Sequence, residues 1–260
     1  MTDRKKSGLA RVLSKMGYCS RSQAAALIRA GRVGLKGRTV RDPEAPVSMG
    51  RDLITVDRAE IAEQTKTYLM MNKPRGVVTT ASDERGRATV YDLLQGMDGW
   101  VGPVGRLDKA SEGLLLLTND SEWAAMITDP GSHLDKRYHV QVDRVATDEL
   151  LARIRQGVVV AGDRFRTKDV RVLRQGEKNS WLEITLDEGK NRHIRRMLDA
   201  LEIEVLRLVR VSVGSLELGD LKKGAVRPLA AGEKLALDRE LGRARKRAPK
   251  NNGRMPIDVG

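Results

Sequence analysis

The chain has 260 residues, enough for one large domain or two unequal ones, and 40% of them are hydrophobic, which argues against wholesale disorder. Lysine and arginine number 48 against 35 aspartates and glutamates, and the formal charge of +13 indicates an acidic partner, either nucleic acid or an anionic membrane surface. We find no apolar run of the roughly 18 residues that span a membrane and no apolar leader, and the one cysteine, Cys19, excludes a disulfide framework and a cysteine-based zinc cluster.

The first part of the chain predicts a small helical module with a β extension. Apolar residues recur at helical spacing over 9–16, and Ser20-x-x-Gln23 is a capping box that predicts the start of a second helix. Glycine-punctuated strands follow over 32–56. We expect a domain over residues 1–62, joined to the next by a polar linker.

Strand patterns dominate residues 66–235. The predicted strands lie at 68–72, 76–80, 101–107, 113–118, 137–142, 158–160, 171–173, 181–186 and 205–213. The predicted helices cover 122–128 (capped by Ser121), 148–156 (capped by Thr147) and 190–201. Many strands with few helices between them predict an α+β fold, with a mixed, largely antiparallel sheet flanked by helices.

The last segment, residues 236–260, is rich in Arg, Lys, Pro, Gly and Asn and has no periodicity. It predicts a disordered basic tail.

Motifs for nucleotides and metals are absent from the sequence. There is no GxxxxGK[ST] phosphate loop, the glycines between 31 and 37 are spaced GxxGxxG, and the three histidines do not form HExxH. We therefore expect no cofactor and no catalytic metal.

The segment Gly105–Asp120 places Asp108 directly after an apolar strand, where a carboxylate can project from a rigid scaffold into a cleft. An isolated aspartate in such a place is more often a turn-capping residue, and the residue pattern alone leaves both interpretations open.

The segment Gly189–Met197 crowds cations into the first turns of a predicted helix, where they oppose the helix dipole. An anion at that end, either an RNA phosphate or a buried carboxylate, would offset the unfavourable charge. A solvated basic face is the alternative.

These motifs together resemble the pseudouridine synthases, in the RsuA/RluB/RluE/RluF branch that modifies ribosomal RNA. The motifs are Asn72-Lys73-Pro74-x-Gly76, Gly105–Asp120, Lys136–Val140 and Asn191–Met197. The first module resembles an S4 RNA-binding domain, through Cys19-Ser20-Arg21 and Gly31-Arg32-Val33. Departures from the pattern are Leu35-Lys36-Gly37, which bears on RNA contacts, and Ala110-Ser111, which keeps a hydroxyl near the loop.

The resemblance implies roles for individual residues. Asp108 matches the catalytic aspartate, Tyr138 the tyrosine that packs on the target base and can act at C5, and Arg195 the arginine that pairs with the aspartate. The RNA contacts we expect in the catalytic domain are Arg106, Lys73, Asn191, Arg192, His193 and Arg196. Lys73 and Pro74 also match a motif that supports the active-site wall. Those in the S4 module are Arg11, Arg21, Arg29, Arg32, Lys36 and Arg38.

The chemistry agrees with these residue types. Isomerising uridine breaks N1–C1′ and makes C5–C1′, so the atoms balance without a cofactor. The reaction needs an ionised carboxylate in a dry pocket, a partner that keeps it charged, and a flipped base. We expect a cytoplasmic monomer that modifies a uridine of ribosomal RNA, favouring the large subunit, on free RNA or an assembly intermediate and without a membrane.

Two other functions compete with this hypothesis. A non-catalytic S4-type RNA-binding or ribosome-assembly factor would leave Asp108, Tyr138 and Arg195 without a joint role. Glycoside hydrolysis by Asp108 and Glu112 would need two carboxylates in one cleft, but no such basic charge.

Overall fold

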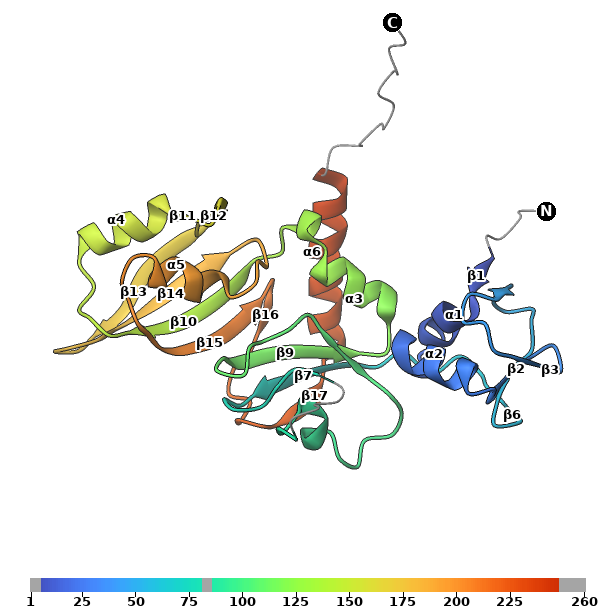
Figure 1. Cartoon of the computed structure of the whole chain (residues 1–260). Coiled ribbons are helices and arrows are strands. Elements are labelled where there is room, and N and C mark those ends of the chain that lie inside the picture. Colours follow the sequence, from blue (N-terminus) through green and yellow to red (C-terminus); the bar gives the residue numbers. More distant parts are fainter. Residues whose placement is uncertain (1–5, 81–85, 248–260) are drawn as a thin grey trace, which may run out of the picture.

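The computed structural model describes residues 6–80 and 86–247, with a small N-terminal unit and a larger one built on a nine-stranded sheet (Figure 1). No helix in this part of the chain is long and apolar enough to cross a membrane.

The N-terminal unit packs two helices against a small sheet. Its helices are α1 (Leu9–Lys15) and α2 (Arg21–Arg29), and the predicted capping box is confirmed: Ser20 Oγ accepts from Gln23 N. Its strands are β1 (Ser7–Gly8), β2 (Val33–Leu35), β3 (Arg38–Val40), β4 (Pro46–Val47), β5 (Ile54–Val56) and β6 (Ala59–Glu60). The sheet runs β3-β2-β5-β6, and β1 pairs with β4. The expected boundary at residues 62–66 falls between β6 and β7.

The large sheet runs in the order β13-β14-β10-β15-β9-β7-β17, with β16 paired to β15 and β8 to β9. Its strands are β7 (Tyr68–Lys73), β8 (Gly102–Val104), β9 (Glu112–Thr118), β10 (Lys136–Val142), β13 (Asp169–Gln175), β14 (Ser180–Leu186), β15 (Val205–Val213), β16 (Leu216–Glu217) and β17 (Val226–Pro228). A separate hairpin joins β11 (Val158–Val160) to β12 (Asp163–Phe165). The strand pairs of the large sheet are antiparallel except β9–β15. The predicted mixed, largely antiparallel α+β fold is therefore confirmed for the described residues.

Helices cover both halves of this sheet. The elements are α3 (Ser121–Thr128), α4 (Asp148–Gln156), α5 (His193–Asp199), α6 (Ala231–Arg247), and the 3-10 turns η1 (Val90–Leu93) and η2 (Pro130–Ser132). Apolar residues of α4 and α5 pack on the half formed by β10, β13 and β14, and those of α3 and α6 pack on the half around β9. The cavity described below lies between these halves.

Four local predictions need correction. Residues 76–80 form only an isolated bridge between Val78 and Thr89, not a strand. The cap of α3 is Asp120, whose carboxylate accepts two backbone N–H groups, and not Ser121. The helix predicted over 190–201 is shorter, as α5 shows.

The C-terminal tail is the fourth correction. Residues 236–247 continue α6, where Leu237 and Leu241 are buried against the sheet, so an apolar stripe had been overlooked among the charges. Residues 248–260 lie outside the described residues.

Gly113 permits the parallel contact at the centre of the sheet. It pairs with Arg210 at φ +103°, and a Cβ atom there would lie 2.2 Å from the Arg210 carbonyl oxygen. Only glycine fits such a close backbone approach. The approach brings the Asp108 loop, just before β9, towards β10 and β15.

Candidate active site

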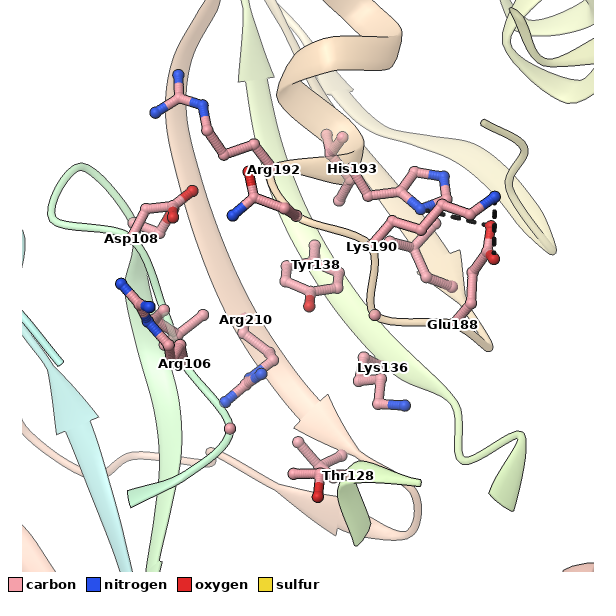
Figure 2. A pocket seen from close by; sticks show the side chains of 18 of the residues that line it. Arg106, Asp108, Thr128, Lys136, Tyr138, Glu188, Lys190, Arg192, His193 and Arg210 are labelled. Atoms are coloured by element: carbon pink, nitrogen blue, oxygen red, sulfur yellow. Dashed lines mark ion pairs between the residues drawn. The ribbon is translucent and has the colours of Figure 1, made fainter. Parts of the chain in front are cut away.

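A cavity of about 620 Å³ opens between the two halves of the sheet. Asp108 reaches it from the loop before β9, and Tyr138 from the middle of β10. Figure 2 shows the two side chains on opposite sides of this cavity. The structure therefore brings together two of the three residues expected to be catalytic, although they are far apart in sequence.

Lys73 fixes the loop that carries Asp108 through backbone hydrogen bonds. Its ammonium donates to the carbonyl oxygens of Asp108 (3.1 Å), Ser111 (2.8 Å) and Pro74 (3.1 Å). The side chain is 0% exposed, and burial lowers the pKa of Lys73 to about 8, against the raising effect of the Asp108 and Glu112 charges. Lys73 is buried and does not line the cavity, which disfavours the predicted RNA contact, and its hydrogen bonds fit the wall-supporting role that the motif implies.

Arg195 also acts on this loop. Its Nη2 donates to the Ala110 carbonyl at 3.1 Å and its Nη1 to the Val205 carbonyl at 3.3 Å. Among the described residues no ion pair joins Arg195 to Asp108, so the expected direct pairing is not seen. The pKa of Arg195 is lowered by burial and by the charge of Arg192, and the Asp108 charge opposes this. Arg195 thus places positive charge near the carboxylate while it fixes the backbone.

Tyr138 lies on a strand, β10, that is paired on both sides. It is paired with Ile184 of β14 and Arg210 of β15, and its ring packs against the core beneath α5. The ring is half-buried, with one side open to the cavity. This arrangement suits a ring that stacks on a base.

The basic segment after β14 divides into two groups. Asn191 and Arg192 are exposed and line the cavity, and Arg192 adopts the left-handed conformation (φ 50°) at the start of α5. Their expected RNA contacts stay a prediction, as does that of the exposed Arg106 on the opposite wall.

His193 and Arg196 are differently placed. His193 is 4% exposed and makes an edge contact with Phe165 at 5.1 Å, and burial lowers its pKa. The guanidinium of Arg196 lies 4.5 Å from the centre of the same ring and does not line the cavity. His193 lines the cavity although it is buried, and its RNA contact stays a prediction, whereas Arg196 packs on Phe165 instead of facing the site.

Glu112 has a structural environment. Its carboxylate is 3% exposed and accepts from Arg207 at 2.7 and 3.0 Å and pairs with Lys223 at 2.7 Å. These cations lower the pKa of Glu112 to about 2, chiefly through the Arg207 hydrogen bonds. Glu112 does not line the cavity and stays ionised, so it cannot act with Asp108 as the general acid of a glycoside hydrolase.

The six predicted cations of the N-terminal unit are all exposed, and half of them are engaged. Arg21 pairs with Glu44 (3.1 Å), Arg32 with Asp57 and Lys36 with Asp52 (3.1 Å). Within the described chain, Arg11, Arg29 and Arg38 form no side-chain ion pair. Their RNA contacts stay a prediction.

Two cavity residues, Lys136 and Arg210, were missed as site residues. Arg210 lies two residues after the buried Leu208 on β15, at an inward position of the strand pattern, and a cation at such a position could have marked it. No cluster of three or more potential metal ligands occurs in residues 6–80 and 86–247.

Comparisons with known proteins agree with this arrangement. The sequence profile of the RNA pseudouridylate synthase family matches residues 67–200, and that of the S4 domain matches residues 8–53. The chain is 36% identical to an uncharacterized RNA pseudouridine synthase of Aquifex aeolicus, over 88% of this chain and 93% of that protein. It is 34% identical to the ribosomal large subunit pseudouridine synthase B of Bacillus subtilis, over 86% and 93%. A crystal structure of a pseudouridylate synthase superposes with a TM-score of 0.63, at 29% identity, over 88% of this chain and 99% of that one.

Proposed function

The chain belongs to the RNA pseudouridylate synthase family, and we propose that it converts one uridine of large-subunit ribosomal RNA to pseudouridine, with Asp108 as the nucleophile. The observation that carries this proposal is the convergence of Asp108 and Tyr138 on one cavity of about 620 Å³. A cavity of this size accepts a flipped nucleotide and excludes most of the surrounding water.

The proposed reaction uses side chains from both walls of the cavity. The Asp108 carboxylate bonds to the uridine, the N1–C1′ bond breaks, and the base rotates. The C5–C1′ bond then forms and the bond to Asp108 breaks, which regenerates the carboxylate. C5 loses its proton and N1 gains one, so the atoms balance. Tyr138 stacks on the base, and its phenol oxygen takes the C5 proton as it passes its own hydroxyl proton to water.

Lys73 and Arg195 position the nucleophile without touching the substrate. Each donates to backbone carbonyls of residues 108–111, and each is a cation near the Asp108 carboxylate. Positive charge in a partly desolvated site favours the ionised form that a nucleophile requires. This replaces the direct ion pair that the sequence predicts.

Ribosomal RNA as the substrate rests on two supports. The S4 domain presents three exposed arginines without ion pairs among the described residues, which suits phosphate contacts. The relative from Bacillus subtilis is named for the large subunit. We place the reaction in the bacterial cytoplasm, where this RNA is found.

The substrate is tested by mapping the product. Transcripts of both ribosomal RNAs are incubated with the protein and treated with a carbodiimide that forms a stable adduct on pseudouridine, and reverse transcription then stops at each adduct. We expect one new stop in the large-subunit RNA. A stop confined to the small-subunit RNA would overturn the subunit assignment. No stop in either RNA, or in assembly intermediates, would favour the RNA-binding factor.

A further inference from the structure

Two of the cavity cations are at least half-buried and form no ion pair among the described residues. Lys136 begins β10, and Arg210 lies on β15 directly opposite Tyr138. Lys136 and Tyr138 are two residues apart on the same strand, so both point to the cavity side of the sheet. Figure 2 shows the three side chains around the part of the cavity that Thr128 closes.

Arg210 is a desolvated cation. Its side chain is buried, at 8% exposure, and its Nε donates to the Leu114 carbonyl at 2.7 Å. In the described part of the chain no carboxylate lies within ion-pair distance of its guanidinium. The two Nη groups therefore remain available to a molecule in the cavity.

Lys136 is half-buried, and it likewise forms no ion pair among the described residues. The two acids whose charges act on Lys136 have other partners: Asp135 pairs with Lys168 at 2.7 Å, and Asp187 lies 3.6 Å from His133. Burial and the charge of Arg210 lower the pKa of Lys136, in spite of these two acids.

The other charged residues of the cavity do not neutralise Lys136 and Arg210. Five cations line the cavity against three carboxylates. Of these carboxylates, Glu188 pairs with Lys190 at 3.4 Å, and Asp129 accepts from the backbone of Gly131 at 2.9 Å. Two neighbouring cations, one buried and one half-buried, are unfavourable without an anion, and a bound anion lowers this penalty.

We propose that Lys136 and Arg210 form a binding site for one backbone phosphate of the RNA, next to the target uridine. This inference rests on the proposed function, because it takes RNA as the substrate. Uracil carries no negative charge, whereas a phosphate accepts hydrogen bonds from both an ammonium and the Nη groups of a guanidinium. Lys136 lies about 7 Å along the strand from Tyr138, the scale of one nucleotide. A base on Tyr138 therefore has its backbone within reach of both cations.

The test compares the salt dependence of turnover in four variants. Lys136→Met and Arg210→Lys alter the site, whereas Lys178→Met and Arg239→Lys are matched changes at exposed positions that do not line the cavity. The substrate is large-subunit ribosomal RNA labelled with tritium at uridine C5, and kcat/KM is measured from about 50 to 200 mM potassium chloride. Thermal unfolding of each free protein is recorded in parallel.

We expect Lys136→Met to lower kcat/KM by about tenfold or more at low salt and to flatten the logarithmic salt slope by about 0.7, one phosphate contact. Arg210→Lys keeps the charge, so it should lose activity with little change in slope. The thermal midpoint of Lys136→Met should not fall, since the variant removes a half-buried charge without an ion pair among the described residues, whereas loss of a purely structural lysine would lower it. The two control variants should match the wild type.

Three outcomes would overturn the inference or separate it from the function. A loss in Lys136→Met with the wild-type salt slope would mean that the lysine contacts an uncharged group, and the phosphate site is then wrong. Full activity in both site variants would also refute it. Absence of tritium release by the wild type would instead refute the proposed function.

Discussion

At the level of single residues, Lys73 and Glu112 show that buried charges beside the site need not be its reacting groups. Lys73 bonds to three carbonyls, and Glu112 is held by Arg207 and Lys223. The sequence motifs identified Asp108 and Tyr138, because motif order carries that information. They could not show that Lys73 and His193 are buried, since exposure depends on chain segments far away in sequence.

Replacing Lys73 tests its positioning role. We expect Lys73→Met to lower kcat by about tenfold or more, because the loop carrying Asp108 loses two hydrogen bonds. RNA affinity should stay near the wild-type value, as measured by filter binding beside single-turnover tritium release. Lys190→Met, an exposed cavity cation, is the control that should weaken binding. A selective loss of affinity in Lys73→Met would restore the RNA-contact prediction.

Glu112 predicts a defined pH dependence of stability. Its pKa falls from 4.5 to about 2 in the folded chain, so its contribution is present above pH 4.5 and is lost as the pH falls towards 2. Glu112→Gln should lower the free energy of unfolding by about 2 kcal/mol at neutral pH, and the difference should shrink between pH 4.5 and 2. Urea unfolding measures both. The exposed Glu217→Gln is the control, and a pH-independent difference for Glu112→Gln would contradict the ion-pair account.

At the level of elements, periodicity predicted what local residues determine. The capping boxes and apolar alternation located α2, α4 and β15, whose boundaries depend on their own side chains. The same reasoning failed for 76–80, which has no partner strand, and for the C-terminal part of α6, whose two leucines need the sheet to bury them. Strand order and the parallel β9–β15 contact could not be predicted, because pairing is a long-range choice.

The β9–β15 contact should be sensitive to one methyl group. Gly113→Ala places a Cβ 2.2 Å from the Arg210 carbonyl at a positive φ, so β9 must move away from β15. We expect a loss of about 2 kcal/mol or more in stability, measured by urea unfolding, and a lower kcat because Asp108 moves relative to Tyr138. Gly219→Ala, also at positive φ but with open space around it, separates backbone strain from the clash. Equal effects in the two variants would refute the close-approach argument.

At the level of the whole molecule, the two units are in contact. Lys15 of α1 pairs with Glu122 of α3 at 2.7 Å, Gln64 N donates to Met16 O, and Asn119 bonds to Thr65 and Thr67 of the connecting segment. Figure 1 shows the N-terminal helices beside the end of α3. Composition predicted an acidic partner for the chain and the family resemblance predicted RNA, but neither predicted this contact, because its residues are ordinary polar side chains.

The N-terminal unit should supply salt-dependent affinity. Deleting residues 1–62 should weaken binding of ribosomal RNA and flatten its logarithmic salt slope by about 2, if Arg11, Arg29 and Arg38 each contact a phosphate of single-stranded RNA. The triple variant of these arginines to Gln, in the full chain, is the control for misfolding of the truncated protein. Filter binding across a salt series measures the slope, and an unchanged slope in both proteins would place the RNA contacts elsewhere.

The central claim is that Asp108 is the nucleophile of a cofactor-independent isomerisation. Forming pseudouridine expels the hydrogen at C5, so large-subunit ribosomal RNA labelled with tritium there should release label to water with the wild type and no added cofactor. Asp108→Asn, which keeps the side-chain shape, should lower the release rate by about 10⁴-fold or more while binding RNA normally. Comparable release by wild type and Asp108→Asn would contradict the assignment of the nucleophile.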